Sequence, residues 1–309
     1  MKLSKPKFWT KKNSFLSILL LPLSFIFILL VEIRRKITTA KSFKIPVICI
    51  GNIFIGGTGK TPTSIFLAHE LSKLGKKPVI LRKYYSNHVD EYNLIKNNFK
   101  NFFTCKSRLD GMNDAIKSGF DVAVLDDGFQ DYRIEKNLNI LCFNQNQLIG
   151  NGLVLPAGPL RERMSALKNV KVVLINGKKD QEFEEKILNI NSKLNIFYST
   201  YKPVNLKQFK NKKLLAIAGI GNPDNFFDLL EKNELTVEKK INFPDHYKFS
   251  KNEIQKIVNV AQKRDLQIVM TEKDYYKINE YNLENIYYLK VSLEIQEKKK
   301  FMNIITSLI

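Results

Sequence analysis

The stretch VICIGNIFIGGTGKTPTSIFLAHEL, residues 47–71, decides the fold of this 309-residue chain. It begins as a short apolar run, typical of a buried parallel strand. Gly56, Gly57 and Gly59 follow, and the rest has the pattern of a helix that ends at Gly75. A strand, a glycine-rich turn and a helix in this order predict a loop whose backbone N–H groups hold phosphate.

The end of this turn resembles a Walker A loop, GxxxxGK[ST]. Gly59, Lys60 and Thr61 supply the GKT, although Phe54 stands where the first glycine belongs. In such loops the lysine contacts phosphate and the hydroxyl holds Mg²⁺. We therefore expect the nucleotide to be bound by Gly56, Gly57, Thr58, Gly59, Lys60 and Thr61. The alternative is a glycine turn that only joins the strand to the helix.

A phosphate site of this kind needs a carboxylate at the end of another buried strand. The sequence VAVLDDGFQ supplies Asp126 and Asp127 there. One carboxylate can hold Mg²⁺ directly or through water. We expect Thr61, Asp126 and Asp127 to form the metal site, whereas a DDG triplet alone would be read as a turn.

Further apolar runs alternate with helical stretches along the chain, which predicts a P-loop NTPase-like α/β fold with a doubly wound sheet. The polar, basic residues 197–213 interrupt this alternation, and it then resumes. We expect a P-loop domain over residues 37–205 and a smaller C-terminal α/β domain over residues 206–309, after an N-terminal segment of residues 1–36.

The N-terminal segment contains an apolar run over residues 15–31 between lysine-rich residues and the sequence EIRRK. As a helix, this run would reach about 26 Å, just short of the ~30 Å hydrocarbon core of a bilayer. The residues after it offer a poor signal-peptide cleavage site. We expect a membrane anchor or a shallowly inserted helix; the alternatives are a buried core helix and a cleaved signal. Whether the helix spans the membrane stays open.

The composition bears on what the protein binds and on the compartment in which it works. The net charge is +20, and only eight of the 50 basic residues are arginine. The positive electrostatic field of such a chain favours binding to an anionic membrane, to nucleic acid or to a phosphorylated substrate, and it does not distinguish among them. Cys49, Cys105 and Cys142 form no CxxC pair, which indicates a reducing compartment, and we expect them in the core.

Three classes of protein fit these observations. One is a membrane-associated P-loop switch or partitioning-type ATPase, but partitioning ATPases carry a signature lysine where this chain has Ile55. Another is a kinase of a small or lipid substrate. A basic membrane protein without enzymatic activity is disfavoured by the phosphate loop together with Asp126.

Six segments in order give a more specific indication: PVICIGNIFIGGTGKTP, DDGFQ, GNGLVLPAGPLRE, GIGNPDNFF, FPDHYKFS and TEKD. Together, over about residues 15–280, they resemble the tetraacyldisaccharide 4′-kinases, or lipid A 4′-kinases. The resemblance implies an enzyme of lipid A biosynthesis that uses ATP and Mg²⁺ to phosphorylate the 4′-hydroxyl of tetraacyldisaccharide 1-phosphate. It also implies the cytoplasmic face of the bacterial inner membrane. The expected partners are this lipid and an anionic membrane surface; we expect no nucleic acid and infer no obligate protein partner.

The resemblance also assigns roles to residues. Lys60 matches the lysine on the ATP phosphates, and Asp90, in VDEY, matches the carboxylate that activates the hydroxyl. His246 matches the histidine that pairs with this carboxylate, and PAGPLRE brings Arg161 and Glu162 to the edge of the site. A sugar hydroxyl is a weak nucleophile, so a carboxylate that accepts its proton is chemically useful.

The chain departs from the family pattern at several places. LRKYYSN replaces the usual SRGYGR, which moves the basic residue to Arg82 or Lys83, and Asp131 replaces the histidine of DDGFQH. These changes bear on substrate contacts. We expect structural roles for His69 and His88.

Overall fold

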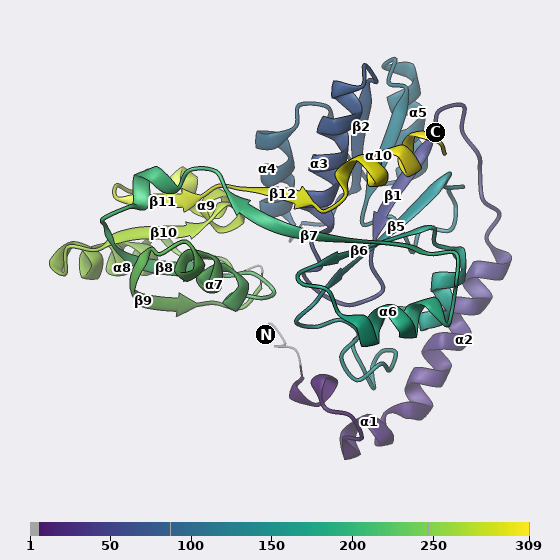
Figure 1. The fold of residues 1–309 in the computed structure, drawn as a ribbon, viewed down its shortest axis with the longest axis horizontal. Helices are drawn as coiled ribbons and strands as arrows, with labels where there is room; N and C mark the ends of the chain where they lie inside the picture. The colour runs from purple at the N-terminus through teal and green to yellow at the C-terminus, as the bar shows by residue number, and fades with distance from the viewer. Residues whose placement is uncertain (1–5, 87, 246, 309) are drawn as a thin grey trace.

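A computed structural model describes residues 6–86, 88–245 and 247–308 of the protein. This part of the chain forms a large and a small α/β lobe, joined by two strands that run between them (Figure 1). The lobes carry the protein's two sheets.

The large lobe is built on an eight-stranded sheet in the order β12-β7-β6-β5-β1-β4-β2-β3. Its strands are parallel except for the antiparallel pair of β12 and β7. They are β1 (Val47–Gly51), β2 (Pro78–Lys83), β3 (Phe102–Cys105), β4 (Val122–Asp126), β5 (Leu138–Asn144), β6 (Val172–Asn176), β7 (Asn195–Pro203) and β12 (Val291–Ile295).

Helices cover both faces of this sheet, because successive side chains of a strand point to opposite faces. Ile48 and Ile50 of β1 pack with α3, α4 and α10, whereas Val47 and Cys49 pack with α5 and α6. The helices of this lobe are α3 (Lys60–Lys73), α4 (Val89–Asn98), α5 (Arg108–Lys117), η2 (Met164–Asn169), α6 (Gln181–Leu188) and α10 (Lys298–Thr306). The predicted doubly wound α/β sheet is thus confirmed.

The small lobe has a parallel four-stranded sheet in the order β11-β10-β8-β9. Helix α7 covers one face and α8 the other. Its elements are η3 (Leu206–Phe209), β8 (Lys213–Ala218), α7 (Asp224–Lys232), β9 (Thr236–Asn242), α8 (Lys251–Lys263), β10 (Gln267–Thr271), α9 (Glu272–Ile278), η4 (Asn279–Tyr281) and β11 (Ile286–Leu289).

The end of the chain corrects the expected division at residues 206–309. After β11 the chain returns to the large lobe, where β12 pairs with β7 and α10 packs beside α3 (Figure 1). The physical reason is burial, since Leu293, Ile295 and Phe301 complete the core on the α3 face of the large sheet. The interrupting stretch 197–213 also holds most of β7, a strand that the sequence did not indicate.

The apolar N-terminal run forms two helices, α1 (Phe15–Leu19) and α2 (Leu21–Ile37), after the short η1 (Lys7–Thr10). Pro22 lies in the first turn of α2. Proline has no backbone N–H to donate, which is tolerated in the first turn of a helix but would interrupt a helix that continued from α1. No helix within the described ranges 6–86, 88–245 and 247–308 is both long and apolar enough to cross a bilayer.

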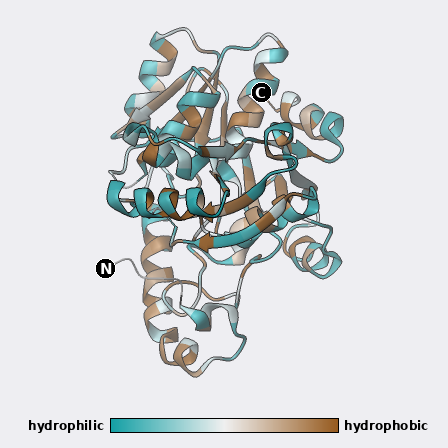
Figure 2. Ribbon diagram, turned by 90° about the vertical axis from the view of Figure 1, so that its left-hand side faces the viewer, coloured by the Kyte–Doolittle hydropathy of each residue, from teal (hydrophilic) through white to brown (hydrophobic). Residues whose placement is uncertain are grey.

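Helix α2 contacts the large lobe through Phe27 and Ile28, which pack against its core, and through polar groups. The buried Ser24 hydroxyl donates to the carbonyl of Val154, and the N–H of Ala157 donates to Ser24. Most apolar side chains of α1 and α2 remain exposed, as the brown colour along these helices shows (Figure 2). They are Phe15, Leu16, Ile18, Leu19, Leu21, Leu23, Phe25, Ile26, Leu29, Leu30, Ile33 and Ile37.

Candidate active site

The phosphate loop connects β1 to α3 and lies at the carboxyl end of the large sheet. Gly59 caps α3 in the left-handed region, at φ 89°, which suits glycine because it has no Cβ. The buried Asn52 holds the loop closed, since its amide donates to the carbonyl of Phe54 at 2.6 Å and to the Thr58 hydroxyl at 3.1 Å. Lys60 is the first residue of α3.

The acidic pair lies directly beside this loop. Asp126, fully buried at the end of β4, accepts hydrogen bonds from the hydroxyls of Thr61 at 3.0 Å and Ser64 at 3.1 Å. Asp127 lies 3.0 Å from Arg161 Nη1 and 3.7 Å from Lys60 Nζ. Burial alone would raise the pKa of Asp127, but the charges of Lys60 and Arg161 outweigh it and hold that pKa well below its usual range.

These residues fit a Mg²⁺–nucleotide site. Mg²⁺ prefers oxygen ligands and is commonly held by one or two carboxylates together with phosphate oxygens. The Thr61 hydroxyl and the Asp126 carboxylate offer such oxygens side by side, with Asp127 next in the chain. The described residues contain no cluster of three or more His, Cys, Asp or Glu that could hold a metal by itself, so substrate oxygens would complete the shell.

Arg82 joins this pair to helix α4. It is buried at the end of β2, and its guanidinium forms ion pairs with Asp126 on one side and Glu91 on the other. Glu91 also lies 3.3 Å from His88 Nδ1. Burial would raise the pKa of Glu91, yet the Arg82 charge lowers it well below its usual range.

The Asp126–Asp127 backbone has its own support. Asp127 has φ 54°, a conformation that non-glycine residues rarely adopt. Arg108 Nη2 donates to the carbonyl of Asp126 at 3.2 Å and to that of Asp127 at 2.6 Å. Asp131, which replaces the family histidine, forms ion pairs with Arg108 and Arg133.

Asp90 lies at the junction of the lobes. It is in the first turn of α4, only 5% exposed, and its Oδ2 is 3.5 Å from both Lys273 Nζ and Lys277 Nζ on α9. Lys273 Nζ also lies 3.2 Å from Asp245. The predicted partner of Asp90, His246, lies outside the described residues.

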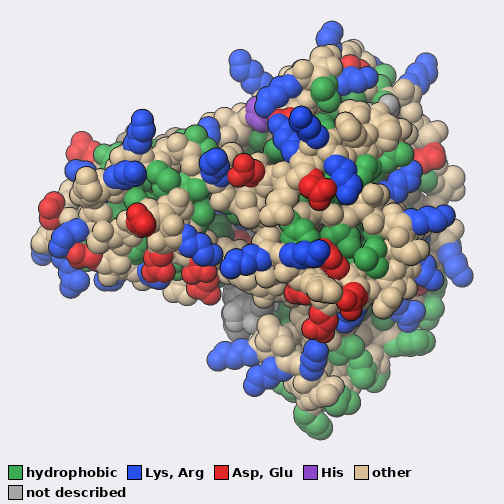
Figure 3. Space-filling model, in the orientation of Figure 1, with side chains coloured by type: hydrophobic (Ala, Val, Ile, Leu, Met, Phe, Trp, Pro, Cys, Tyr) green, Lys and Arg blue, Asp and Glu red, His purple; other side chains and the backbone are tan. Residues whose placement is uncertain are grey.

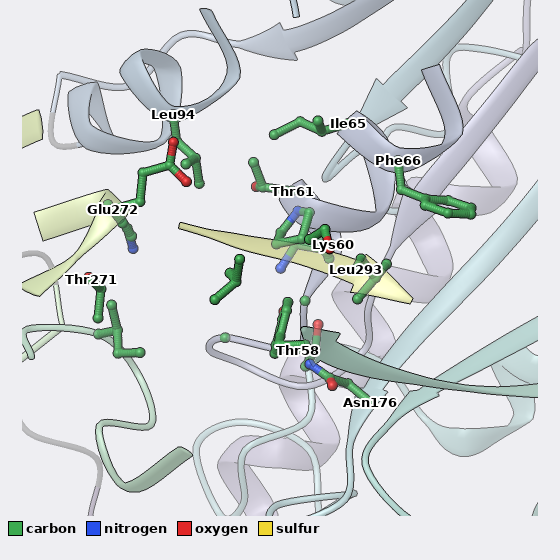
Figure 4. Close-up of a pocket in the computed structure, with 18 of the residues that line it drawn as sticks. Thr58, Lys60, Thr61, Ile65, Phe66, Leu94, Asn176, Thr271, Glu272 and Leu293 are labelled. Carbon is green, nitrogen blue, oxygen red and sulfur yellow. The ribbon is translucent and has the colours of Figure 1, made fainter. Parts of the chain in front are cut away.

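A cleft of about 1110 Å³ separates the lobes. The phosphate loop, Asp127 and Arg161 line one side, and Glu91, Asp245 and Lys273 line another. Asp90 is not among the lining residues, but it lies 3.5 Å from Lys273, which is. Figure 4 shows side chains from both lobes around the open space, several of them apolar. The apolar residues labelled there include Ile65, Phe66, Leu94 and Leu293.

The structure therefore brings most of the predicted residues together and corrects one. Arg161 lines the cleft as expected, but Glu162 does not. Glu162 is buried and lines a second, small cavity beside α2, with Arg35 among its neighbours. Burial raises the pKa of Glu162.

Several residues of the site were missed. Arg108 belongs to no sequence motif that indicates a role in the site. Lys273 lies in the TEKD segment and Lys277 follows it, but the segment itself indicates only the family. His88 was given a structural role, but it lines the cleft beside Glu91. His69 lines the cleft as well, and its Nε2 lies 2.8 Å from the carbonyl oxygen of Asn98.

Comparison with known proteins tests the kinase interpretation. A family model described as tetraacyldisaccharide-1-P 4′-kinase matches residues 16–101 and 86–309. The tetraacyldisaccharide 4′-kinase of Pelagibacter ubique is 42% identical over 98% of this chain and 97% of its own length. That of Francisella tularensis subsp. novicida is 32% identical over 94% of this chain and 98% of its own.

A solved structure supports the fold. The "apo" form of LpxK from Aquifex aeolicus, in complex with ATP, has a TM-score of 0.75 and 23% identity, over 95% of this chain and 99% of that one. The sequence matches favour the kinase over the switch or partitioning-type ATPase. Because the family model and these relatives span nearly all of it, the chain belongs to the tetraacyldisaccharide-1-P 4′-kinase family.

Proposed function

We propose that this protein transfers the γ-phosphoryl group of ATP to the 4′-hydroxyl of tetraacyldisaccharide 1-phosphate in lipid A biosynthesis. One observation carries the proposal beyond family membership. The phosphate loop and Asp127, which is next to the buried Asp126, face a cleft whose other wall holds a cluster of carboxylates and ammonium groups beside Asp90. Such a cleft can bring a nucleotide and a hydroxyl acceptor together while excluding water.

On the nucleotide side, the backbone N–H groups of residues 56–61 and the Lys60 ammonium would bind the ATP phosphates. Arg161 lines the same side and would add positive charge where charge develops during transfer. Mg²⁺, held by Thr61 and Asp126 with Asp127 beside them, would neutralise charge on the phosphates.

On the acceptor side, Asp90 would accept the proton of the 4′-hydroxyl. The acceptor oxygen forms a bond to the γ-phosphorus, and the bond from that phosphorus to the ADP oxygen breaks with its electron pair leaving on ADP. The resemblance to the family adds His246 as the partner of Asp90. Glu91 and Lys273 line the cleft and Asp90 lies beside them, so the hydroxyl would approach Asp90 at this part of the wall.

The exposed apolar side chains of α1 and α2 support a membrane location for this reaction. We propose that they insert shallowly into the cytoplasmic face of the bacterial inner membrane, where a lipid precursor would be available. Hydrophobic side chains gather at the lower end of the molecule, and lysines and arginines are spread over the rest of the visible face (Figure 3). Apolar insertion combined with a net charge of +20 supplies the two signals that stable binding to an anionic membrane needs.

The test is phosphate transfer from labelled ATP to tetraacyldisaccharide 1-phosphate in mixed micelles with Mg²⁺. Transfer to the 4′ position should fall severely in both Lys60→Ala and Asp90→Ala, while ATP affinity should fall only in Lys60→Ala. Lys76→Ala, which changes an exposed lysine after α3, is the matched control. ATP binding without transfer in the unmodified protein would refute the proposed acceptor, and a normal rate in Asp90→Ala would remove Asp90 from its role.

A further inference from the structure

Lys273 makes a contact between the lobes at the proposed base. Its Nζ lies 3.5 Å from Asp90, 3.6 Å from Glu91 and 3.2 Å from Asp245. Asp90 and Glu91 belong to α4 of the large lobe, whereas Lys273 and Asp245 belong to the small lobe. Helices α4 and α9 also meet at Asn98, whose amide donates to Glu272 at 2.9 Å. One ammonium group is therefore shared by carboxylates of both lobes.

The start of α9 holds this ammonium in a fixed place. The hydroxyl of Thr271, the residue before α9, accepts from the N–H of Asp274. The buried Asp274 carboxylate also accepts from the N–H of Gly219 at 2.6 Å and lies 2.6 Å from Lys277 Nζ. Lys273 and Lys277 are four residues apart on one helix, so both can face Asp90.

The other charges around Asp90 already have partners. Arg82 neutralises Glu91, and Lys277 is closest to Asp274. Lys273 and Lys277 lie equally close to Asp90, at 3.5 Å, but of the two only Lys273 also contacts Glu91 and Asp245 and lines the cleft. Burial alone would lower the pKa of Lys273, but the neighbouring carboxylates outweigh it and raise that pKa, so the group stays charged near neutral pH.

We propose that Lys273 is a positioning residue of the transfer reaction, which keeps Asp90 ionised and fixes it against the cleft wall. The proposal rests on the proposed function, in which Asp90 accepts the hydroxyl proton. It makes the small lobe part of the acceptor site, because Lys273 lines the cleft and its ammonium group lies 3.5 Å from Asp90.

The test is the pH dependence of kcat at saturating ATP and lipid for Lys273→Met and Lys273→Arg. Loss of an opposite charge within 4–6 Å raises the pKa of a carboxylate. In Lys273→Met, the acidic limb of the kcat–pH profile, which reports ionisation of Asp90, should therefore move to higher pH by about one unit. Lys273→Arg keeps the charge and should keep the limb in place. Lys73→Met, at an exposed lysine at the end of α3 that lines the same cleft, is the matched control and should leave the limb unchanged.

Other outcomes overturn the proposal. A lower kcat at every pH with the limb unmoved would mean that Lys273 only holds the lobes together. A raised KM for ATP with the limb unmoved would place Lys273 on the nucleotide. If Lys273→Met does not fold, as judged by ATP binding and Tm, then Lys273→Gln, which can still hydrogen-bond to the carboxylates, must show the same shift. Absence of transfer in the unmodified protein would instead refute the proposed function.

Discussion

Arg82 is the point where the nucleotide side and the acceptor side of the site meet, and replacing it should destabilise the large lobe. Arg82→Met keeps an unbranched apolar stem and removes the guanidinium group with its charge. In the native protein, Arg82 is 3% exposed and pairs with the fully buried Asp126 and with Glu91. The substitution therefore leaves two carboxylates in the interior without their main counter-charge.

The expected cost follows from what each carboxylate retains. Removing one partner of a buried ion pair typically costs 3–5 kcal/mol, because the other charge stays buried. Asp126 keeps its hydrogen bonds from Thr61 and Ser64, and Glu91 keeps Lys273 within 3.6 Å. Because these contacts remain, we expect the lower end of that range, a decrease of about 3 kcal/mol in the free energy of unfolding.

The assay is urea unfolding, followed by circular dichroism and by the fluorescence of Trp9, the single tryptophan. Trp9 reports on the large lobe because its indole N–H donates to the carbonyl of Pro156. A double-mutant cycle with Glu91→Gln isolates the pair: in the Arg82→Met background, Glu91→Gln should be far less destabilising than in the native protein. Arg264→Met, at an exposed arginine of the small lobe, is the control.

The dependence on pH gives a second check. Arg82 lowers the pKa of Glu91 in the folded protein below its ordinary value of 4.5. A carboxylate with a lowered folded pKa contributes stability above the unfolded pKa, and this contribution is lost as pH falls through the folded pKa. The deficit of Arg82→Met should therefore be largest near neutral pH and shrink below about pH 4.5. A deficit under about 1 kcal/mol at pH 7 would refute the reasoning, since surface substitutions alone cost that little.

Two further predictions concern the phosphate loop and the membrane. Gly59→Ala places a Cβ on a residue with φ 89°, 3.1 Å from the Tyr201 hydroxyl. The resulting strain of about 1–2 kcal/mol should weaken ATP binding roughly tenfold, as measured by calorimetry. Gly75→Ala, at a left-handed glycine with open space around it, is the control and should leave ATP affinity unchanged. Phe25→Ser removes an exposed apolar side chain of α2 and should weaken flotation with anionic vesicles several-fold at high salt; unchanged flotation would argue against insertion of this helix.

The elements that could be predicted from sequence are those whose signal is local. Strands such as β1 and β4 are buried on both faces, so they appear as continuous apolar runs. Strand β7 was missed because its second half, toward Pro203, alternates between exposed and half-buried residues as it leaves the large lobe. The return of β12 was also missed, since an antiparallel pair across about 90 residues leaves no local pattern.

The site divides in the same way. The phosphate loop and the pair Asp126–Asp127 each follow a buried strand, and parallel strands end at the same edge of a sheet, so their meeting could be predicted. Asp90 could be singled out only through the family resemblance, because a lone carboxylate at a helix start is usually a solvated capping residue. Lys273 could not be assigned a role at all, since its environment exists only once α9 packs on α4.

This division has a mechanistic consequence. The nucleotide side depends on contacts within the large lobe, whereas the surroundings of Asp90 depend on both lobes being packed together. Loosening the small lobe should therefore impair the acceptor chemistry while ATP binding to the loop persists. The linking strands β7 and β12 pair with each other over Ser199–Pro203 and Val291–Ile295, and they are the only strands that connect the two sheets within the described residues. Substitutions in that pair, apart from Tyr201, whose hydroxyl lies beside Gly59 of the phosphate loop, should change kcat more than ATP affinity, because they act on how α9 meets α4 and leave the contacts of Lys60 and Asp127 in place.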